Sequence, residues 1–274
     1  MKKIYVLGNG LLGNYVYSYL SRRKGKLVEQ ITRKDIDFSR IELSEFVNDN
    51  MFDEHSVIVN CIGVLKPNID KVGIDVAVKI NKNLPIALSD ISTLKDIDVI
   101  NISSDCVFSG KKGNYTEVDF CDATDYYGLT KSLDSVHTTV IRTSFIGHEI
   151  NNKTGILEFA LRNAGNTING YTNCIWNGVT ALELADWINH IIDTNSYWCG
   201  VQHIYSKSKI SKYDLLHLIN NVYELNLKII PVLAEEIVGT KIEGVLDRSL
   251  SSIFRVPVNS SIEEQLILLK NYTL

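Results

Sequence analysis

Short apolar runs, rich in β-branched residues, alternate with stretches of helical periodicity along the first half of the chain. The apolar runs cover residues 4–7, 27–31, 57–61, 99–102 and 139–141, and the helical stretches cover 13–23, 76–91 and 126–136. Near-continuous apolar runs are typical of strands that are buried on both faces. The pattern therefore predicts an α/β fold with a doubly wound parallel sheet, which binds ligands at the carboxyl ends of its strands.

The pattern loosens after about residue 143. Glycines interrupt it, and then we predict a helix over 182–193, a strand over 201–205 and a further helix over 212–223. We expect one domain over residues 1–145 and a smaller lobe over 146–274. Late elements of the sheet, at about 178–205, are expected to be interleaved with that lobe.

A glycine-rich turn, Gly8-Asn9-Gly10-Leu11-Leu12-Gly13, directly follows the first apolar run. This Gly-x-Gly-x-x-Gly pattern, placed between a predicted strand and a predicted helix, is typical of dinucleotide binding. The first glycine permits a tight turn, the second lets the backbone approach a pyrophosphate, and the third allows close helix packing. The helix N-terminus offers free amides to the phosphates. The turn predicts a Rossmann-type domain over 1–145, with all six residues at the cofactor.

The end of the second strand indicates which dinucleotide is bound. An acidic residue about 20 positions beyond the last glycine usually holds the ribose 2′-hydroxyl of NAD. Here that position is Arg33, within Thr32-Arg33-Lys34. Because a guanidinium can bind a 2′-phosphate through two hydrogen bonds, we expect NADP, with NADPH preferred over NADH. Thr32, Arg33 and Asp37 are the residues expected there, and a solvated basic turn is the alternative.

A tyrosine and a lysine four positions apart, in Tyr127-Gly128-Leu129-Thr130-Lys131, form the second motif. Residues at i and i+4 share a helix face. A lysine ammonium about 4 Å from the tyrosine would lower the pKa of its hydroxyl toward neutrality, which makes a general acid. Gly128 would let the cofactor approach the helix. Both Tyr127 and Lys131 are expected to be catalytic and to contact the cofactor.

Two serines follow the fourth apolar run directly, in Ser103-Ser104-Asp105. A serine at a strand end can donate a hydrogen bond to a substrate carbonyl or to its developing oxyanion. We predict Ser104 as the catalytic hydroxyl, with Ser103 as the alternative.

The net charge, the length of the apolar runs and the cysteine spacing argue against several classes of function. The 274 residues are 45% hydrophobic and carry a net charge of −4, which predicts no binding to nucleic acid or to anionic membranes. No apolar run approaches the roughly 18 residues of a membrane span. Five cysteines without a Cys-x-x-Cys pair or metal-ligand spacing are typical of a reduced, cytoplasmic protein. We therefore expect a cytoplasmic protein without a metal site.

These motifs resemble the extended short-chain dehydrogenase/reductase superfamily, and within it the dTDP-4-dehydrorhamnose reductases and related nucleotide-sugar reductases. Members carry Ser-Thr-Asp-Tyr-Val-Phe, which here reads Ser103-Ser104-Asp105-Cys106-Val107-Phe108. Residues 141–147 resemble their Leu-Arg-Thr-Ser-Trp-Val-Tyr-Gly segment. Cys106 thus replaces an aromatic residue, and Phe145 replaces a tryptophan expected near the sugar.

The resemblance implies further site residues. Those implied at the cofactor are Cys61, Ile62, Gly63, Asn81 and Ser103, and those implied at the substrate are Ser104, Phe145 and Arg248. Trp176-Asn177 has no assigned counterpart in the family, but both residues are also predicted at the substrate. Trp176 would stack there on a sugar or base, and a half-buried packing aromatic is the alternative. The superfamily's dehydratases place Asp-Glu after the catalytic hydroxyl, whereas Cys106 follows Asp105 here. This difference favours a reductase.

The resemblance implies reduction of a nucleotide-linked 4-keto-6-deoxy sugar by NADPH, in deoxysugar synthesis for surface polysaccharides. Two alternatives stay open: a nucleotide-sugar epimerase or epimerase-reductase, and a non-catalytic, NADP-binding regulatory subunit. The expected partner is the nucleotide-sugar substrate, and a homodimer is left open.

Overall fold

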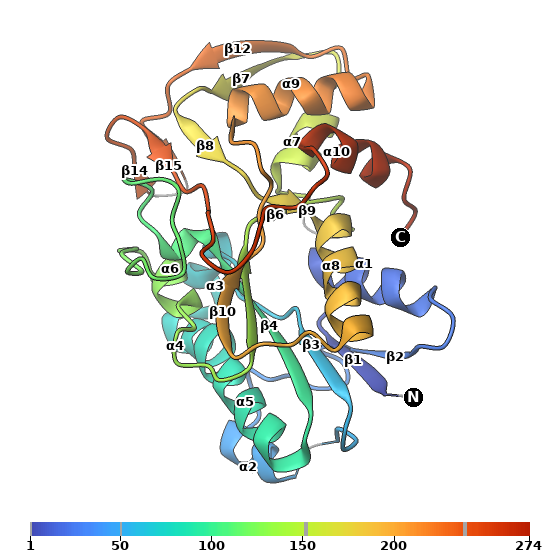
Figure 1. Ribbon diagram of the computed structural model, residues 1–274. Helices are drawn as coiled ribbons and strands as arrows, with labels where there is room; N and C mark the ends of the chain where they lie inside the picture. Colours follow the sequence, from blue (N-terminus) through green and yellow to red (C-terminus); the bar gives the residue numbers. More distant parts are fainter. Residues whose placement is uncertain (1, 50, 151–152, 238–239) are drawn as a thin grey trace.

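A six-stranded parallel sheet forms the centre of the protein, in a computed structural model that describes residues 2–49, 51–150, 153–237 and 240–274 (Figure 1). The strand order is β10-β5-β4-β3-β1-β2, and every neighbouring pair is parallel. The strands are β1 (Lys3–Leu7), β2 (Leu27–Ile31), β3 (Val57–Asn60), β4 (Asp98–Ser104), β5 (Thr139–Thr143) and β10 (Gly200–His203). The predicted α/β fold with a doubly wound, Rossmann-type sheet is confirmed.

The order of the strands reverses beside β1. The chain passes from β1 to β2 on one side and then returns to β3 on the other, so that Leu7 pairs with both Ile31 and Asn60. Ligands of doubly wound sheets bind at such a switch point, beyond the carboxyl ends of the strands. The glycine turn after β1 and the segment after β3 both lie there.

Helices cover both faces of the sheet (Figure 1). Alternate residues of β1 point to opposite faces: Val6 packs in a core with α1 (Leu11–Ser21) and α8 (Ala181–Thr194). Tyr5 packs in a second core with α2 (Leu43–Asn48) and α5 (Leu84–Lys95). Burial of strands on both faces is the reason that they appear as continuous apolar runs in the sequence.

Two predicted helices differ from the structure. The stretch 76–91 is divided into α4 (Ile74–Val78), a π-helical turn η2 (Lys79–Asn83) and α5. The stretch 126–136 is helical only in α6 (Tyr126–Lys131). This helix stops early because the Lys131 carbonyl oxygen accepts a hydrogen bond from the Ser103 hydroxyl (2.7 Å), while the Ser132 hydroxyl donates to Asp134. Short helical segments η1 (Lys66–Asn68), α3 (Ile69–Val72) and η3 (Asp105–Val107) complete this half.

A smaller lobe stands on the carboxyl edge of the sheet (Figure 1). It contains short sheets that pair β7 with β12, β8 with β11 and β15, β6 with β9, and β13 with β14. Helices α7, α9 and α10 pack around them. The bounds are β6 (Phe145–Ile146), α7 (Ile156–Arg162), β7 (Thr167–Tyr171), β8 (Cys174–Trp176), β9 (Val179–Thr180), β11 (Ile210–Ser211), α9 (Lys212–Tyr223), β12 (Lys228–Val232), β13 (Glu236–Ile237), β14 (Thr240–Lys241), β15 (Leu246–Asp247) and α10 (Ile262–Lys270).

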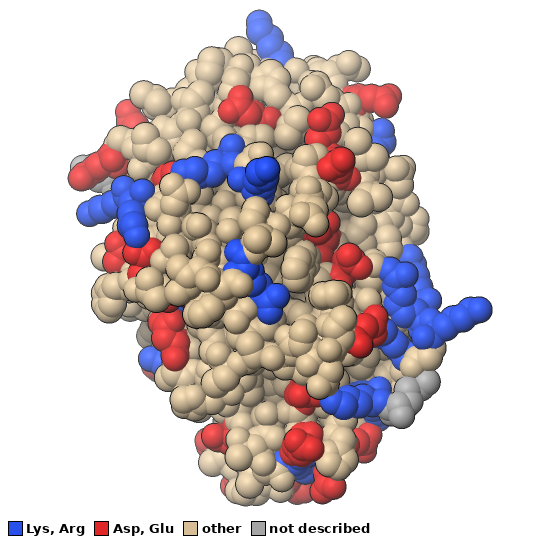
Figure 2. All heavy atoms as spheres, in the orientation of Figure 1, with Lys and Arg blue, Asp and Glu red and all other residues tan. Residues whose placement is uncertain are grey.

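The surface carries both signs of charge. Figure 2 shows acidic and basic side chains dispersed over one face, with basic groups also near its middle, where the lobe meets the sheet. No helix in the described ranges combines the length and the hydropathy that a bilayer crossing requires. All five cysteines are free, and Cys199, just before β10, is the exposed one.

Candidate active site

The glycine turn joins β1 to α1 in a shape that needs glycine at two positions. Gly8 has a φ of +95°, which favours glycine. A Cβ added to Gly13 would lie only 2.2 Å from the Gly8 carbonyl oxygen, whereas one added to Gly10 would meet nothing within 4 Å. No side chain of the described residues caps α1. Open space therefore lies over the free amides at the start of this helix, as an anion requires.

The remaining residues of the glycine turn hold its shape through a hydrogen bond and through apolar packing. Asn9 is exposed, and its carbonyl oxygen accepts a hydrogen bond from the Asn14 side-chain amide (3.0 Å). Leu12 is buried in the core beneath the turn, with Leu11 half-buried beside it. Only the backbone of Leu12 therefore faces the place that the sequence assigns to the pyrophosphate.

The segment after β3, residues 61–63, forms a wall that faces the glycine turn. Cys61 continues the strand, since its amide donates to the Leu7 carbonyl oxygen (3.0 Å). An added Cβ on Gly8 would lie 3.1 Å from Ile62 Cγ1, so the turn and this wall are in contact. Gly63 is exposed, and Lys131 Nζ would lie 3.0 Å from its added Cβ. The structure thus brings Cys61, Ile62 and Gly63 to the glycine turn.

Charged groups gather where β2 ends. The Thr32 amide and hydroxyl both donate to the Asp35 carboxylate, at 2.8 Å each. The Arg33 side chain is 74% exposed, and its Nε lies 3.9 Å from Asp37 Oδ1. Arg40 Nε lies 3.3 Å from the other oxygen of Asp37. The guanidinium groups of Arg33 and Arg40 therefore flank the carboxylate of Asp37. The sequence analysis predicted Arg33 and Asp37 at this position, but it did not identify Asp35 and Arg40.

Asn81 holds the wall and the Tyr-Lys helix together. It lies buried in the π-helical turn η2, a feature frequent at functional sites. Its Oδ1 accepts a hydrogen bond from the Val64 amide (2.8 Å). Its Nδ2 donates to the Val64 carbonyl oxygen (3.0 Å) and to Thr130 Oγ1 (3.1 Å). Asn81 therefore fixes α6 relative to the segment after β3.

The two serines at the end of β4 have different partners. The buried Ser103 hydroxyl donates to the Lys131 carbonyl oxygen, which ends α6. The Ser104 hydroxyl accepts from the Cys106 amide (3.1 Å) and lies 3.2 Å from an Asp105 carboxylate oxygen. It also lies close enough to Tyr127 to lower the pKa of the tyrosine hydroxyl. Of the two serines, Ser104 is the one paired with the tyrosine.

Tyr127 and Lys131 project from α6 into a dry environment. Burial raises the pKa of Tyr127, and the Ser104 hydroxyl partly offsets this rise. Burial lowers the pKa of Lys131 to about 8. Lys131 Nζ donates to the Ile102 carbonyl oxygen (3.2 Å), beside Gly63. The predicted lowering of the Tyr127 pKa by the Lys131 ammonium is therefore wrong: burial raises this pKa, and Lys131 is not among the main influences on it.

Helix α6 is held at its start by Asp125. One oxygen of Asp125 accepts a hydrogen bond from the Gly128 amide (3.1 Å), and the other pairs with Lys66 Nζ (3.2 Å). The structure gives Gly128 a packing role that the sequence did not predict: a Cβ added there would lie 2.3 Å from the Cys106 carbonyl oxygen and 2.4 Å from Ala123 Cβ. This glycine allows α6 to pack on the protein.

The predicted substrate residues do not all face this site. Trp176 is nearly buried and donates to Ser144 Oγ (2.9 Å). Asn177 is buried, with Oδ1 accepting from the Leu250 amide (2.8 Å) and Nδ2 donating to the Leu250 carbonyl oxygen (2.8 Å). Both the oxygen and the nitrogen of the Asn177 side-chain amide are therefore paired with the backbone inside the lobe, and do not face this site. Phe145, in β6, is half-buried against the core.

Arg248 does lie beside the segment that follows Ser104. Its Nε donates to the Phe108 carbonyl oxygen (2.9 Å), and its Nη1 lies 3.6 Å from Cys106 Sγ. Together with Lys212, it counters the effect of burial, which raises the pKa of Asp105. The sequence analysis missed Lys212, because a lysine at the start of a predicted helix carries no signal of its own.

A family model described as "RmlD substrate binding domain" matches residues 1–253. The chain belongs to this family. Membership places it among the NAD(P)-dependent oxidoreductases of the extended short-chain dehydrogenase/reductase superfamily, as the motifs predicted. No curated protein sequence matches the chain.

Solved structures share the fold of this family member at low identity. A dTDP-4-dehydrorhamnose reductase of Bacillus anthracis, in complex with NADP, has a TM-score of 0.82 and 21% identity, over 98% of this chain and 99% of that chain. The Clostridium acetobutylicum reductase of the same name has a TM-score of 0.77 and 21% identity, over 98% of each chain. A GDP-6-OMe-4-keto-L-xylo-heptose reductase of Campylobacter jejuni has a TM-score of 0.73 and 11% identity, over 98% and 96%.

Within the described ranges, no group of three or more His, Cys, Asp or Glu side chains is arranged to hold a metal ion.

Proposed function

We propose that this protein reduces the 4-keto group of a nucleotide-linked 4-keto-6-deoxy sugar with NADPH. The approach of Tyr127 to the Ser104 hydroxyl, which lowers the pKa of Tyr127, carries this proposal. Two hydroxyl groups therefore lie near each other at the carboxyl end of β4, and Lys131 of the same helix reaches Gly63 on the wall beside the glycine turn. One carbonyl oxygen could accept a hydrogen bond from each. Membership in the family and the names of the solved relatives support this class of substrate.

The residues present fit a nicotinamide dinucleotide. Gly8, Gly10 and Gly13 form a cradle with open space and free amides, which suits a pyrophosphate. Arg33 would bind a 2′-phosphate beyond β2, and this supports NADPH over NADH. Lys131 Nζ, beside the exposed Gly63, would hold the nicotinamide ribose. When bound, the nicotinamide supplies the hydride.

The protein's own residues would supply the proton and stabilise the negative charge that develops on the ketone oxygen. Tyr127 would donate its hydroxyl proton to the ketone oxygen as the carbon accepts the hydride, so that the ketone becomes an alcohol. Ser104 would donate a hydrogen bond to the same oxygen and stabilise its developing negative charge. Burial keeps the Tyr127 proton in place until a substrate oxygen can accept it.

The decisive experiment follows the absorbance of NADPH with a panel of dTDP-, UDP- and GDP-linked 4-keto-6-deoxy sugars. Consumption of NADPH in equal amount to one sugar would establish the reductase. Turnover of a sugar without net consumption of NADPH would indicate the epimerase instead. Binding of NADPH with no turnover across the panel would contradict the proposal in favour of a regulatory subunit.

A further inference from the structure

Apolar residues are exposed beside the end of β10, on two segments that are far apart in the sequence. One segment is the loop after β4, and the other precedes α10. Five residues, each between 56% and 85% exposed, form what we call the apolar edge surface: Val118, Phe120, Ile253, Phe254 and Val256. The two segments are in contact, because Glu117 accepts hydrogen bonds from the Ile253 amide (3.0 Å) and from the Ser252 hydroxyl.

The charged side chains of the same two segments are turned back into the protein. Glu117 is held by the contacts just described, and Asp119 is paired with Lys112. Arg255 lies over the Trp198 ring, with its Cζ 4.2 Å from the ring centroid. Apolar groups outside and charged groups inside are the reverse of an ordinary surface loop. Exposed apolar patches of this kind mark interaction sites.

The edge of the main sheet is already covered next to this surface. Strand β10 is the last of the sheet, and an open edge strand can pair with a strand of another molecule. Here the His203 amide donates to Glu117 (2.9 Å), and Arg255 Nε donates to the Gln202 side chain. A partner therefore meets the side chains of the apolar edge surface rather than the backbone of β10.

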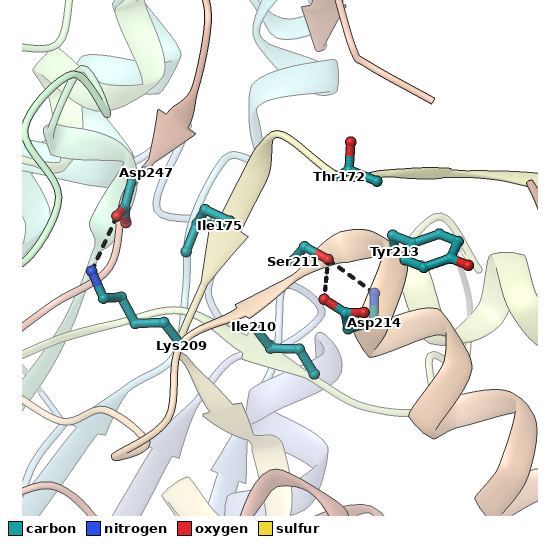
Figure 3. A pocket seen from close by; sticks show the side chains of 8 residues that line it. All are labelled: Thr172, Ile175, Lys209, Ile210, Ser211, Tyr213, Asp214 and Asp247. Atoms are coloured by element: carbon teal, nitrogen blue, oxygen red, sulfur yellow. Dashed lines mark hydrogen bonds and ion pairs between the residues drawn. The ribbon is translucent and has the colours of Figure 1, made fainter. Parts of the chain in front are cut away.

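The cavity in the smaller lobe is a different kind of surface. It has a volume of about 550 Å³ and lies between β8, β11, β15 and the start of α9. Figure 3 shows Lys209 paired with Asp247 (3.2 Å) on one side of it, and Asp214 bonded to the Ser211 hydroxyl (2.6 Å) on the other. Because charged residues are depleted at the core of protein interfaces, this cavity does not suit an apolar partner.

Area and charge both favour a second copy of this chain on the apolar edge surface. The five residues expose on the order of 600 Å², at the upper end of the apolar patches found on monomers. A standard interface buries about 800 Å² on each partner, so this surface supplies most of one side of a dimer. Since Glu117, Asp119 and Arg255 are paired within the chain, they neither attract a charged partner nor repel an identical copy.

We propose that the apolar edge surface is the interface of a homodimer with twofold symmetry. In such a dimer both copies use the same surface, so each contact occurs twice. The two phenylalanines, one on each segment, are the anchors: Phe120 of each copy packs on Phe254 of the other. Buried aromatic anchors carry most of the binding energy of an interface. This inference does not depend on the proposed reaction.

Sedimentation velocity at about 10 µM protein tests the interface, and the wild type should sediment as a dimer. Phe120→Lys and Phe254→Asp should each raise the Kd of dimerisation by at least roughly thirtyfold, the effect of losing a central aromatic anchor. Each variant should therefore shift toward monomer. An equimolar mixture of the two variants should recover the dimer, because the introduced lysine of one copy then faces the introduced aspartate of the other.

The matched control is Leu94→Asp, which places the same charge at an exposed apolar position on α5, outside the apolar edge surface. It should sediment as the wild type does. Phe254→Ser removes the same ring without adding charge and should also favour the monomer, and circular dichroism verifies that each variant is folded. A monomeric wild type, a dimer that survives the substitutions of Phe120 and Phe254, an equal loss in Leu94→Asp, or a mixture that stays monomeric would overturn the proposal.

Discussion

At the scale of single residues, burial decides the protonation of the site. It raises the pKa of Tyr127 and lowers that of Lys131 to about 8, so that each group favours its neutral form more than it does in water. For the tyrosine this retains the proton that the proposed reaction needs. For the lysine it means that charge is lost from the ligand-free site as the pH rises through about 8.

Replacement of Tyr127 by Phe tests the proton donor. We expect turnover to fall by roughly 10²–10⁴-fold, because only the transferred proton is removed. Affinity for NADPH, measured by fluorescence titration, should stay within about twofold, since the ring and its packing remain. Unchanged turnover would remove Tyr127 from the mechanism.

Replacement of Arg33 by Ala tests the choice of cofactor. The affinity for NADPH should fall by roughly tenfold and that for NADH should change little, because only NADPH carries the 2′-phosphate. Lys34→Ala, also exposed and one position on, is the control. Equal losses for both cofactors would argue against a 2′-phosphate contact.

The sequence predicted those residues whose role depends on spacing along one element. The glycine turn and the Tyr127–Lys131 pair are local patterns, and the structure brings both to the carboxyl edge of the sheet. The use of the Asn177 amide within the lobe could not be predicted, because its partner Leu250 is 73 positions away. Lys212 was missed for the same reason, because Asp105, whose pKa it lowers, lies far from it in the sequence.

At the scale of elements, the helix that carries Tyr127 is too short to be stable alone. Helix α6 has six residues, whereas isolated helices below roughly 12 residues are marginal in water. Its position depends on the Asp125 cap, the Lys66 ion pair and the Asn81–Thr130 hydrogen bond. The sequence predicted a longer helix, since periodicity could not reveal that Ser103 takes the carbonyl of Lys131.

Replacement of Asp125 by Ala should therefore impair both stability and activity. Loss of the cap should lower the free energy of unfolding by about 1 kcal/mol, and turnover should fall because α6 carries the proton donor. Ser261→Ala is the control, since Ser261 caps α10, far along the chain from the site. Chemical denaturation and steady-state assays should show similar stability losses for the two variants, with turnover reduced only in Asp125→Ala. Equal turnover in both would show that α6 does not depend on its cap.

At the scale of the whole molecule, one carboxylate joins three distant segments. Glu117, in the loop after β4, accepts hydrogen bonds from the His203 amide (2.9 Å) in β10 and from the Ile253 amide (3.0 Å). The His203 ring is fully buried beside it, and burial lowers its pKa to about 4. Glu117 thus links the loop to the last strand of the sheet and to the segment before α10, and the buried His203 ring beside it stays neutral near pH 7.

Stability should consequently fall in mild acid. Between about pH 6.5 and pH 4 the unfolded chain protonates His203 while the folded protein does not, so protons favour unfolding as the pH drops through this window. His203→Asn, whose amide can still donate to the Ser251 carbonyl oxygen, should show a weaker dependence of unfolding free energy on pH. His190→Asn, at an exposed position, should match the wild type. A wild-type slope retained in His203→Asn would assign the acid sensitivity to other groups.

Because the strands are parallel, the proposed active site and the exposed thiol of Cys199 lie at opposite edges of the sheet. The site lies at the carboxyl ends of the strands, whereas Cys199, the exposed thiol, precedes β10 at the opposite edge of the sheet. The other four cysteines are buried or half-buried. A maleimide dye can therefore be attached at Cys199 in the unaltered protein, which gives a fluorescent reporter of assembly that leaves the site untouched.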